Sequence, residues 1–184
     1  MTPLFAVASL HSYRIGMSLV IREAVPEIDW PTGIWPIFQA VVAAEDCYPF
    51  PADVDEATAR NYWLQPQPAK VFVALQNSDG AILGTYCVKA NQPGFGAHVA
   101  NAAFMVATSA QGQGVGRALA QHALAWARGA GFTAMQFNYV VSTNTAAVAL
   151  WKDLGFSIAG TLPEAFEHRK LGRRVDVFIM HRFL

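Results

Sequence analysis

Runs of apolar residues with the spacing of strands alternate along the chain with stretches whose apolar residues recur at helical spacing. Strand-type runs occupy residues 18–24, 70–75, 81–89, 98–106 and 134–141, and a closing hairpin joins 156–161 to 174–183. Helical spacing is found over residues 30–44, 53–64, 115–129 and 145–154. The pattern therefore predicts a single α/β domain of the mixed α+β kind, in the order strand, two helices, three strands, helix, strand, helix and two strands.

Prolines and turn residues mark where several of these elements begin and end. The first helix is expected to be entered through Pro31 and Pro36, and two prolines in the segment 49–51 prevent it from continuing. Residues 77–80 (Asn-Ser-Asp-Gly) predict a hairpin turn. Because no internal repeat or linker interrupts the chain, one domain is expected.

A glycine-rich turn separates the strand that ends at Val106 from the helix that begins near Val115. Gly112, Gly114 and Gly116 stand at alternate positions just before and within the first helical turn. Glycine lets the backbone approach a ligand closely, and the free amides of a first helical turn, together with the helix dipole, favour a phosphate-sized anion. The turn is therefore interpreted as a cradle for a diphosphate.

Two well-known nucleotide-binding turns do not fit these residues. A dinucleotide-binding turn requires a third glycine where Arg117 stands, and an acidic residue about 20 positions further on, where residues 133–139 contain none. A P-loop requires Gly-Lys-Ser/Thr, which the sequence lacks. The expected diphosphate therefore belongs to a ligand other than a dinucleotide or a P-loop nucleotide.

Two segments match motifs of one known family. Residues 111–116 (Gln-Gly-Gln-Gly-Val-Gly) fit the pattern Gln/Arg-x-x-Gly-x-Gly/Ala, and residues 144–156 fit Asn-x-x-Ala-x-x-Leu-Tyr-x-x-x-Gly-Phe, with Trp151 in place of the tyrosine. In these segments the chain resembles the GCN5-related N-acetyltransferases (GNAT). The resemblance covers residues 17–184 and implies a mostly antiparallel, splayed sheet of about seven strands flanked by about four helices. Residues 1–16 are interpreted as an N-terminal extension without an assigned function.

The resemblance also implies acetyl-CoA as co-substrate, lying between two strands that separate, 98–106 and 134–141. Backbone groups of Phe104, Met105 and Val106 would hold the pantetheine arm and polarise the thioester, and Asn144 would contact pantetheine. A bulge in the first strand would bring Asn101 and Phe104 to the same, acceptor side. The diphosphate would bind to the glycine-rich turn and its flanks: Gln111, Gly112, Gln113, Gly114, Val115, Gly116 and Arg117.

Two asparagines within apolar strands need an explanation. An unpaired buried amide costs about 1–3 kcal/mol, so Asn101 and Asn138 require partners. One interpretation is that each satisfies irregular backbone at the separation of the strands, and the other is that they orient an acceptor or a water molecule in catalysis. Their spacing resembles the azetidine-2-carboxylate (proline-analogue) acetyltransferase branch, which implies acceptor orientation by both asparagines and an apolar acceptor contact at Phe104. Tyr48 is a further candidate for acceptor binding.

Neither an acid nor a base is identified by the sequence. Trp151 occupies a position where the family commonly has a tyrosine acid; indole cannot donate a proton near neutral pH, so core packing is expected. Residue 144 is also expected to cap the following helix. The histidines lack ligand spacing, and no metal is expected. Candidate bases near the acceptor are Glu45, Glu164, Glu167, His168 and Asp176.

Composition narrows the class of partner. The 184 residues are 53% hydrophobic and 14% charged with a net charge of +0, which argues against a nucleic-acid partner bound to a basic surface. Cys47 and Cys87 lie far apart and are expected to be reduced thiols. No run reaches membrane-spanning length, and the apolar patch 3–10 lacks the basic region of a secretion signal. A cytoplasmic protein is expected, and a homodimer is left open.

The leading hypothesis is direct transfer of acetyl from acetyl-CoA to the amine of a small molecule, such as an amino or imino acid. Acetylation of a protein N-terminus or lysine is the first rival. A CoA-binding module without turnover is the second, because neither acid nor base is evident.

Overall fold

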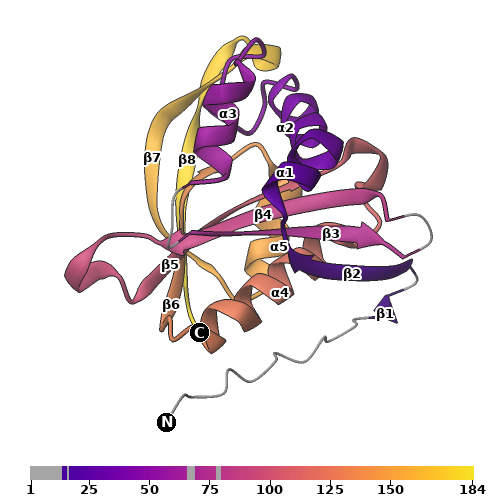
Figure 1. Ribbon diagram of the computed structural model, residues 1–184. Helices are drawn as coiled ribbons and strands as arrows, with labels where there is room; N and C mark the ends of the chain where they lie inside the picture. Colours follow the sequence, from indigo (N-terminus) through magenta and orange to yellow (C-terminus); the bar gives the residue numbers. More distant parts are fainter. Residues whose placement is uncertain (1–13, 16, 66–68, 78–79) are drawn as a thin grey trace.

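The computed structural model describes residues 14–15, 17–65, 69–77 and 80–184, which form one sheet with helices on both faces (Figure 1). The eight strands lie in the order β1-β2-β3-β4-β5-β6-β8-β7. The seven predicted strands are all present, as β2 to β8. Their bounds are β1 Arg14–Ile15, β2 Met17–Glu23, β3 Lys70–Gln76, β4 Ile82–Ala90, β5 Val99–Val106, β6 Ala134–Val141, β7 Ser157–His168 and β8 Arg173–Phe183.

The N-terminal extension contributes only its last residues to this description. Arg14–Ile15 pairs with β2 at the sheet edge, and the other residues of the predicted 1–16 extension lie outside the described ranges. The predicted turn at 77–80 lies partly outside them too.

Strand pairing confirms a mostly antiparallel, splayed sheet. Every neighbouring pair is antiparallel except β5 and β6, which are parallel. These two strands pair only at Val99↔Ala134 and Ala100↔Met135. Beyond Ala100 they diverge, and this opening is called the splay below.

The helices are α1 Pro26–Asp29, α2 Trp35–Val42, α3 Glu56–Trp63, α4 Val115–Gly129 and α5 Thr145–Asp153. The first helical segment begins earlier than predicted, and a π-helical turn, Trp30–Ile34, joins α1 to α2. Pro31 and Pro36 lack the N–H that an α-helix uses, and the Trp35 N–H bonds to the Trp30 carbonyl instead. The second helix starts three residues later than predicted because Asp55 caps it, accepting a bond from the Thr58 N–H at 2.9 Å.

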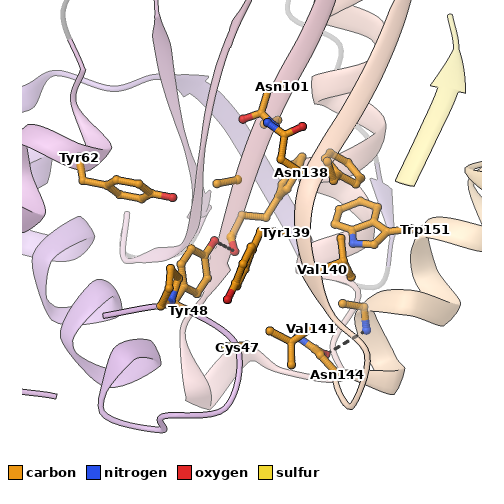
Figure 2. Close-up of a pocket in the computed structure, with 16 residues that line it drawn as sticks. Cys47, Tyr48, Tyr62, Asn101, Asn138, Tyr139, Val140, Val141, Asn144 and Trp151 are labelled. Carbon is orange, nitrogen blue, oxygen red and sulfur yellow. Dashed lines mark hydrogen bonds between the residues drawn. The ribbon is translucent and has the colours of Figure 1, made fainter. Parts of the chain in front are cut away.

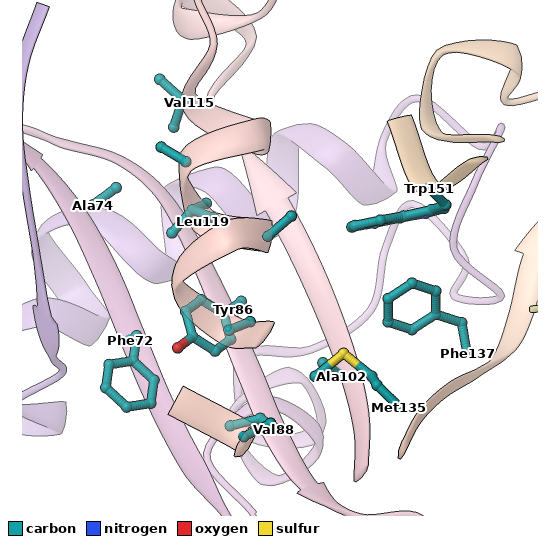
Figure 3. Close-up of a cluster of buried hydrophobic side chains, with 14 of the residues drawn as sticks. Phe72, Ala74, Tyr86, Val88, Ala102, Val115, Leu119, Met135, Phe137 and Trp151 are labelled. Carbon is teal, nitrogen blue, oxygen red and sulfur yellow. The ribbon is translucent and has the colours of Figure 1, made fainter. Parts of the chain in front are cut away.

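Each face of the sheet has its own apolar core. Helix α4 packs on β4 and β5, where Leu119 is fully buried against Tyr86, and Phe137 and Trp151 extend this core toward α5 (Figure 3). On the opposite face α1, α2 and α3 bury a second cluster around Phe38. The sheet edges of the splay are thereby held between two rigid layers.

The closing hairpin is longer than predicted. Its first strand, β7, runs to His168 rather than 161, and its register with β8 shifts between Ile158 and Gly160 and again between Leu162 and Phe166. As an edge strand, β7 is exposed at most positions, with only Phe166 and His168 buried. The sequence of β7 therefore lacks a regular alternation of apolar and polar residues, which explains why the strand was predicted to end at residue 161.

Candidate active site

The backbone of β5 directs the polar groups of alternate residues toward the splay. The register with β4 runs without a shift from Gly84↔Val106 to Ala90↔Ala100. Two hydrogen bonds lie at the ends of this paired segment. The Ala107 N–H donates to the Leu83 carbonyl at 2.9 Å, and the Asn91 N–H donates to the Val99 carbonyl at 2.8 Å. Because such bonds alternate in an antiparallel pair, odd-numbered residues of β5 bond to β4 and even-numbered residues turn toward β6. Phe104 and Val106 therefore direct backbone groups into the splay, whereas those of Met105 face β4.

The bulge lies in β6, not in β5 as predicted. β6 pairs with β8 at Phe137↔Met180 and next at Val140↔Phe178. Between these two pairs the chain moves on by three residues in β6 but by only two in β8, so β6 carries one extra residue. The extra residue falls at Asn138 and Tyr139, both exposed. Since β5 pairs regularly, Asn101 and Phe104 face opposite sides of it, and the expected shared side is wrong.

The Phe104 side chain belongs to the core between the sheet and α5. Its ring stacks on Tyr86 with centroids 5.3 Å apart and lies 5.0 Å from Trp151. Trp151 is itself 4.5 Å from Phe137 and only 8% exposed, which confirms the prediction of core packing. Phe104 thus borders the opening mainly through its backbone.

A cavity of about 250 Å³ opens at the splay (Figure 2). Its walls come from the loop after α2 with Tyr48, from α3 with Tyr62, from β5 and β6, and from α5. The lining residues that the structure describes include no Asp, Glu, His, Lys or Arg. Burial raises the pKa of Cys47 and that of Tyr62 to about 12, so these groups are neutral as well.

Four amide side chains cross the strands beside this cavity. Asn101 Nδ2 donates to the Gln136 carbonyl at 2.9 Å, just past the last paired residues of β5 and β6. Gln136 Nε2 donates to Asn138 Oδ1 at 2.8 Å, and Asn138 Nδ2 donates to Asn91 Oδ1 at 2.6 Å. Asn91 and Gln136 were not predicted as part of this site. The sequence signal for Gln136 is that it and Asn138 are both polar and lie two positions apart on one strand face.

Tyr48 ties the loop after α2 to the splay. Its hydroxyl donates to the Phe104 carbonyl at 2.8 Å (Figure 2). Burial, followed by the neighbouring Tyr62, raises the pKa of Tyr48 well above its usual value, so the phenol stays protonated. Its hydroxyl therefore holds the β5 edge in place, as a wall of the cavity.

The glycine-rich turn has the backbone geometry of an anion site. Gly112 and Gly114 have φ of 72° and 85°, and Gly114 is the residue that precedes α4. The first helical bond, from Ala118 to Gly114, leaves the amides of Val115 and Gly116 without a partner in the described part of the chain. A Cβ atom on Gly112 would meet no atom within 4 Å, so the turn is open to a ligand. The residues present therefore fit a diphosphate.

Side chains of this turn are engaged elsewhere. Val115 is buried in the core, and Gln113 Nε2 donates to the Ser109 carbonyl at 2.7 Å. Arg117 pairs with Asp153 of α5 at 2.9 Å, which joins the two helices. The turn offers an anion mainly backbone amides.

The comparison with known families settles the classification. The family model described as "Acetyltransferase (GNAT) family" matches residues 37–156, which contain the splay, the glycine-rich turn and the whole motif at residues 144–156. The chain belongs to the GNAT family. The reaction class of this family is acyl transfer, with acetyl-CoA as co-substrate.

Individual GNAT proteins show the same relationship. A GCN5-related N-acetyltransferase from Kribbella flavida is 45% identical with a TM-score of 0.83, covering 90% of this chain and 98% of that one. N-acetyltransferase aca1 of Schizosaccharomyces pombe is 35% identical over 99 residues, 54% of this chain and 47% of aca1, so the chain spans about half the length of that relative. The yncA structure from Salmonella typhimurium, which contains its cofactor acetyl-CoA, has the same fold at a TM-score of 0.74 and 24% identity, with 91% and 94% coverage.

Within this GNAT fold, Asn144 has the predicted capping role. Its Oδ1 accepts a bond from the Ala147 N–H at 3.2 Å at the start of α5, and the residue also lines the cavity (Figure 2). Capping and contact with a ligand are compatible for this side chain.

Charged side chains line a second cavity, which adjoins the first. A second cavity of about 260 Å³ shares Tyr48 and Tyr139 with the first and is lined by Glu45, Glu167 and Arg169. Of the predicted candidate bases, Glu45 and Glu167 thus lie in the cavity next to the splay, while Asp176 accepts a bond from the Glu164 N–H at 3.0 Å.

The described residues contain neither a metal-binding cluster nor a membrane-spanning helix. They contain no group of three or more His, Cys, Asp or Glu arranged to hold a metal ion. None of their helices is long and apolar enough to cross a membrane.

Proposed function

We propose that the protein transfers the acetyl group of acetyl-CoA directly to the amine of a small molecule, an amino or imino acid. The observation that carries this proposal is the cavity of about 250 Å³ at the splay, small and without a charged wall. Lys170 of the β7–β8 hairpin forms an ion pair with Asp46 of the loop after α2 at 3.2 Å. Since both segments border the acceptor side, this contact narrows the opening and favours a small acceptor over an extended peptide.

The cofactor residues in this proposal act mainly through their backbone. Amides of Gly114, Val115 and Gly116 bind the diphosphate, and the even-numbered residues of β5, Phe104 and Val106, bind the pantetheine arm. Acetyl-CoA supplies a thioester carbonyl that an amine attacks, with CoA as the leaving group. The Phe104 N–H, which the alternation along β5 turns toward the splay, polarises that carbonyl, and Tyr48 keeps the β5 edge in position.

Asn101 provides the acceptor contact. Its Nδ2 is bonded to Gln136, but in the described part of the chain no donor occupies Oδ1, which accepts a bond from the incoming amine. Asn138 acts by orientation, because its amide is held between Gln136 and Asn91.

The amine must arrive uncharged, because no carboxylate or imidazole lines the cavity. We expect kcat/KM to rise about tenfold per pH unit below the pKa of the acceptor amine, with no plateau near neutral pH. A plateau set by a group of pKa 6–8 on the protein would reveal a base and contradict this part of the proposal.

Release of free CoA with a panel of amines tests the proposal. Azetidine-2-carboxylate and proline should be acetylated faster than polyamines, aminoglycosides or lysine peptides; the resemblance to the proline-analogue branch supports this order. Efficient acetylation of peptides without activity on any free amino or imino acid would contradict the proposal. Saturable binding of acetyl-CoA without CoA release for any amine would support a binding module instead.

A further inference from the structure

The tip of the β7–β8 hairpin concentrates positive charge. Arg169, Lys170, Arg173 and Arg174 supply four of the 13 lysines and arginines of a chain whose net charge is +0. A third cavity, of about 340 Å³, lies at this tip and is lined by Arg169, Arg173 and Arg174 with His168, Glu167 and Gly172. One carboxylate therefore faces three guanidinium groups.

Several polar groups of this cavity have no partner. Lys170 pairs with Asp46, and Arg169 lies 3.7 Å from Glu167, but no ion pair or hydrogen bond within the described ranges uses the side chain of Arg173 or Arg174.

His168 adds a buried polar atom. The strand register places it directly opposite Arg173, so the two side chains share one face of the hairpin. His168 is only 7% exposed, and its Nδ1 has no hydrogen-bond partner among the residues that the structure describes. His168 lines the same cavity as Arg173 and Arg174, and guanidinium groups together with an imidazole N–H are suited to binding an anion.

This cavity adjoins the acceptor side of the active site. Glu167 and Arg169 line both it and the second cavity, and Tyr48 and Tyr139 connect the second cavity to the splay. We infer that the hairpin cavity binds a carboxylate or phosphate at the distal end of the acceptor molecule. The inference rests on the proposed function and extends it: the preferred acceptor is a small amine with an anionic group several bonds from the nitrogen.

The substrate test uses pairs of acceptors that differ only in the distal charge. Wild-type protein should acetylate amino acids with a distal carboxylate or phosphate ester more efficiently than the matching distal amides. Whichever of the two anionic acceptors has the higher kcat/KM identifies the chemical class of the preferred acceptor. In the double variant Arg173→Gln/Arg174→Gln, KM for the anionic acceptor should rise about 10- to 100-fold, since a lost charge-assisted contact is worth at least tenfold. KM for the amide and for acetyl-CoA should not change.

Two further variants separate charge recognition from a structural effect. Arg128→Gln removes an exposed arginine from the last turn of α4, away from the hairpin, and should leave all three constants unchanged. His168→Phe retains an aromatic ring beside Phe166, whose centroid lies 6.0 Å away, and should keep the melting temperature while weakening the anionic acceptor about tenfold. Equal KM changes for anionic and amide acceptors, or none in the double variant, would overturn the inference.

A binding experiment keeps the inference testable if no amine is acetylated. Calorimetric titration with inorganic phosphate and with glutarate, in saturating CoA so that the glycine-rich turn is already occupied, should show saturable binding of at least one anion in the wild type and in Arg128→Gln, and none in the double variant. Absence of CoA release would contradict the proposed function alone. Binding that is equal in wild type and double variant, or undetectable in both, would contradict the anion site.

Discussion

Replacing Asn101 with alanine tests whether this side chain holds the splay together. The bond from Asn101 Nδ2 to the Gln136 carbonyl, at 2.9 Å, is the first link between β5 and β6 after their two paired residues. Its loss should cost about 0.5–1.5 kcal/mol, the net value of one hydrogen bond, because Gln136 is half-buried and its carbonyl can reach water. For a chain of this length, that corresponds to a fall in Tm of about 1–6 °C.

The same variant should impair the acceptor more than the cofactor. Asn101 Oδ1 borders the cavity, so its removal should lower kcat/KM for the acceptor about 10- to 100-fold. KM for acetyl-CoA should change less than threefold, because the diphosphate turn is untouched. Thermal unfolding followed by circular dichroism gives Tm, and CoA release at saturating acetyl-CoA gives the kinetic constants.

Asn91→Ala is the matched control. It removes the partner of Asn138 and leaves the bond between Asn101 and Gln136 intact, so its Tm should stay closer to that of the wild type. A normal Tm for Asn101→Ala would refute the structural role of the bond. Unchanged acceptor kinetics in a folded Asn101→Ala variant would refute the contact with the amine.

Four further results are expected. Saturating acetyl-CoA at about 100 times Kd should raise Tm by about 5–11 °C, and Gly114→Val should abolish this shift because a side chain would occupy the turn at φ 85°; a retained shift would show that the diphosphate binds elsewhere. Trp151→Phe should keep most turnover, since an aromatic core contact remains, and collapsed turnover at normal Tm would assign the indole a chemical role. Asn144→Ala should lose about 1 kcal/mol with the helix cap and raise KM for acetyl-CoA before other constants, and unchanged values of both would remove Asn144 from the site. The Arg22 guanidinium and the Val25 N–H lower the pKa of buried Asp29 below 3.8. The ionised carboxylate therefore stabilises the fold above that pH, and this stabilisation disappears as the pH falls through the lower pKa of the folded state. Asp29→Asn should lower Tm at pH 7 and make Tm depend less on pH in the acid range.

Local patterns in the sequence were sufficient for the order of the elements and for the position of the glycine-rich turn before α4. The apolar stripe of the helix that became α4 depends only on residues three and four apart, and the positive φ of Gly112 and Gly114 follows from residues that tolerate it. The capping role of Asn144 is also local, since donor and acceptor lie three residues apart. The order of the elements and the cap by Asn144 were predicted correctly because their causes are local in the chain.

The arrangement around the acceptor depended on contacts between distant segments. The bulge lies in β6, where the register with β8 shifts. The sequence of residues 134–141 alone does not indicate which strand carries the extra residue. Asn101 meets Gln136, 35 positions away, and Tyr48 meets Phe104, 56 positions away. Strand register is decided by which apolar faces are buried together, so these pairings appear only once the whole sheet has packed between its two helical layers.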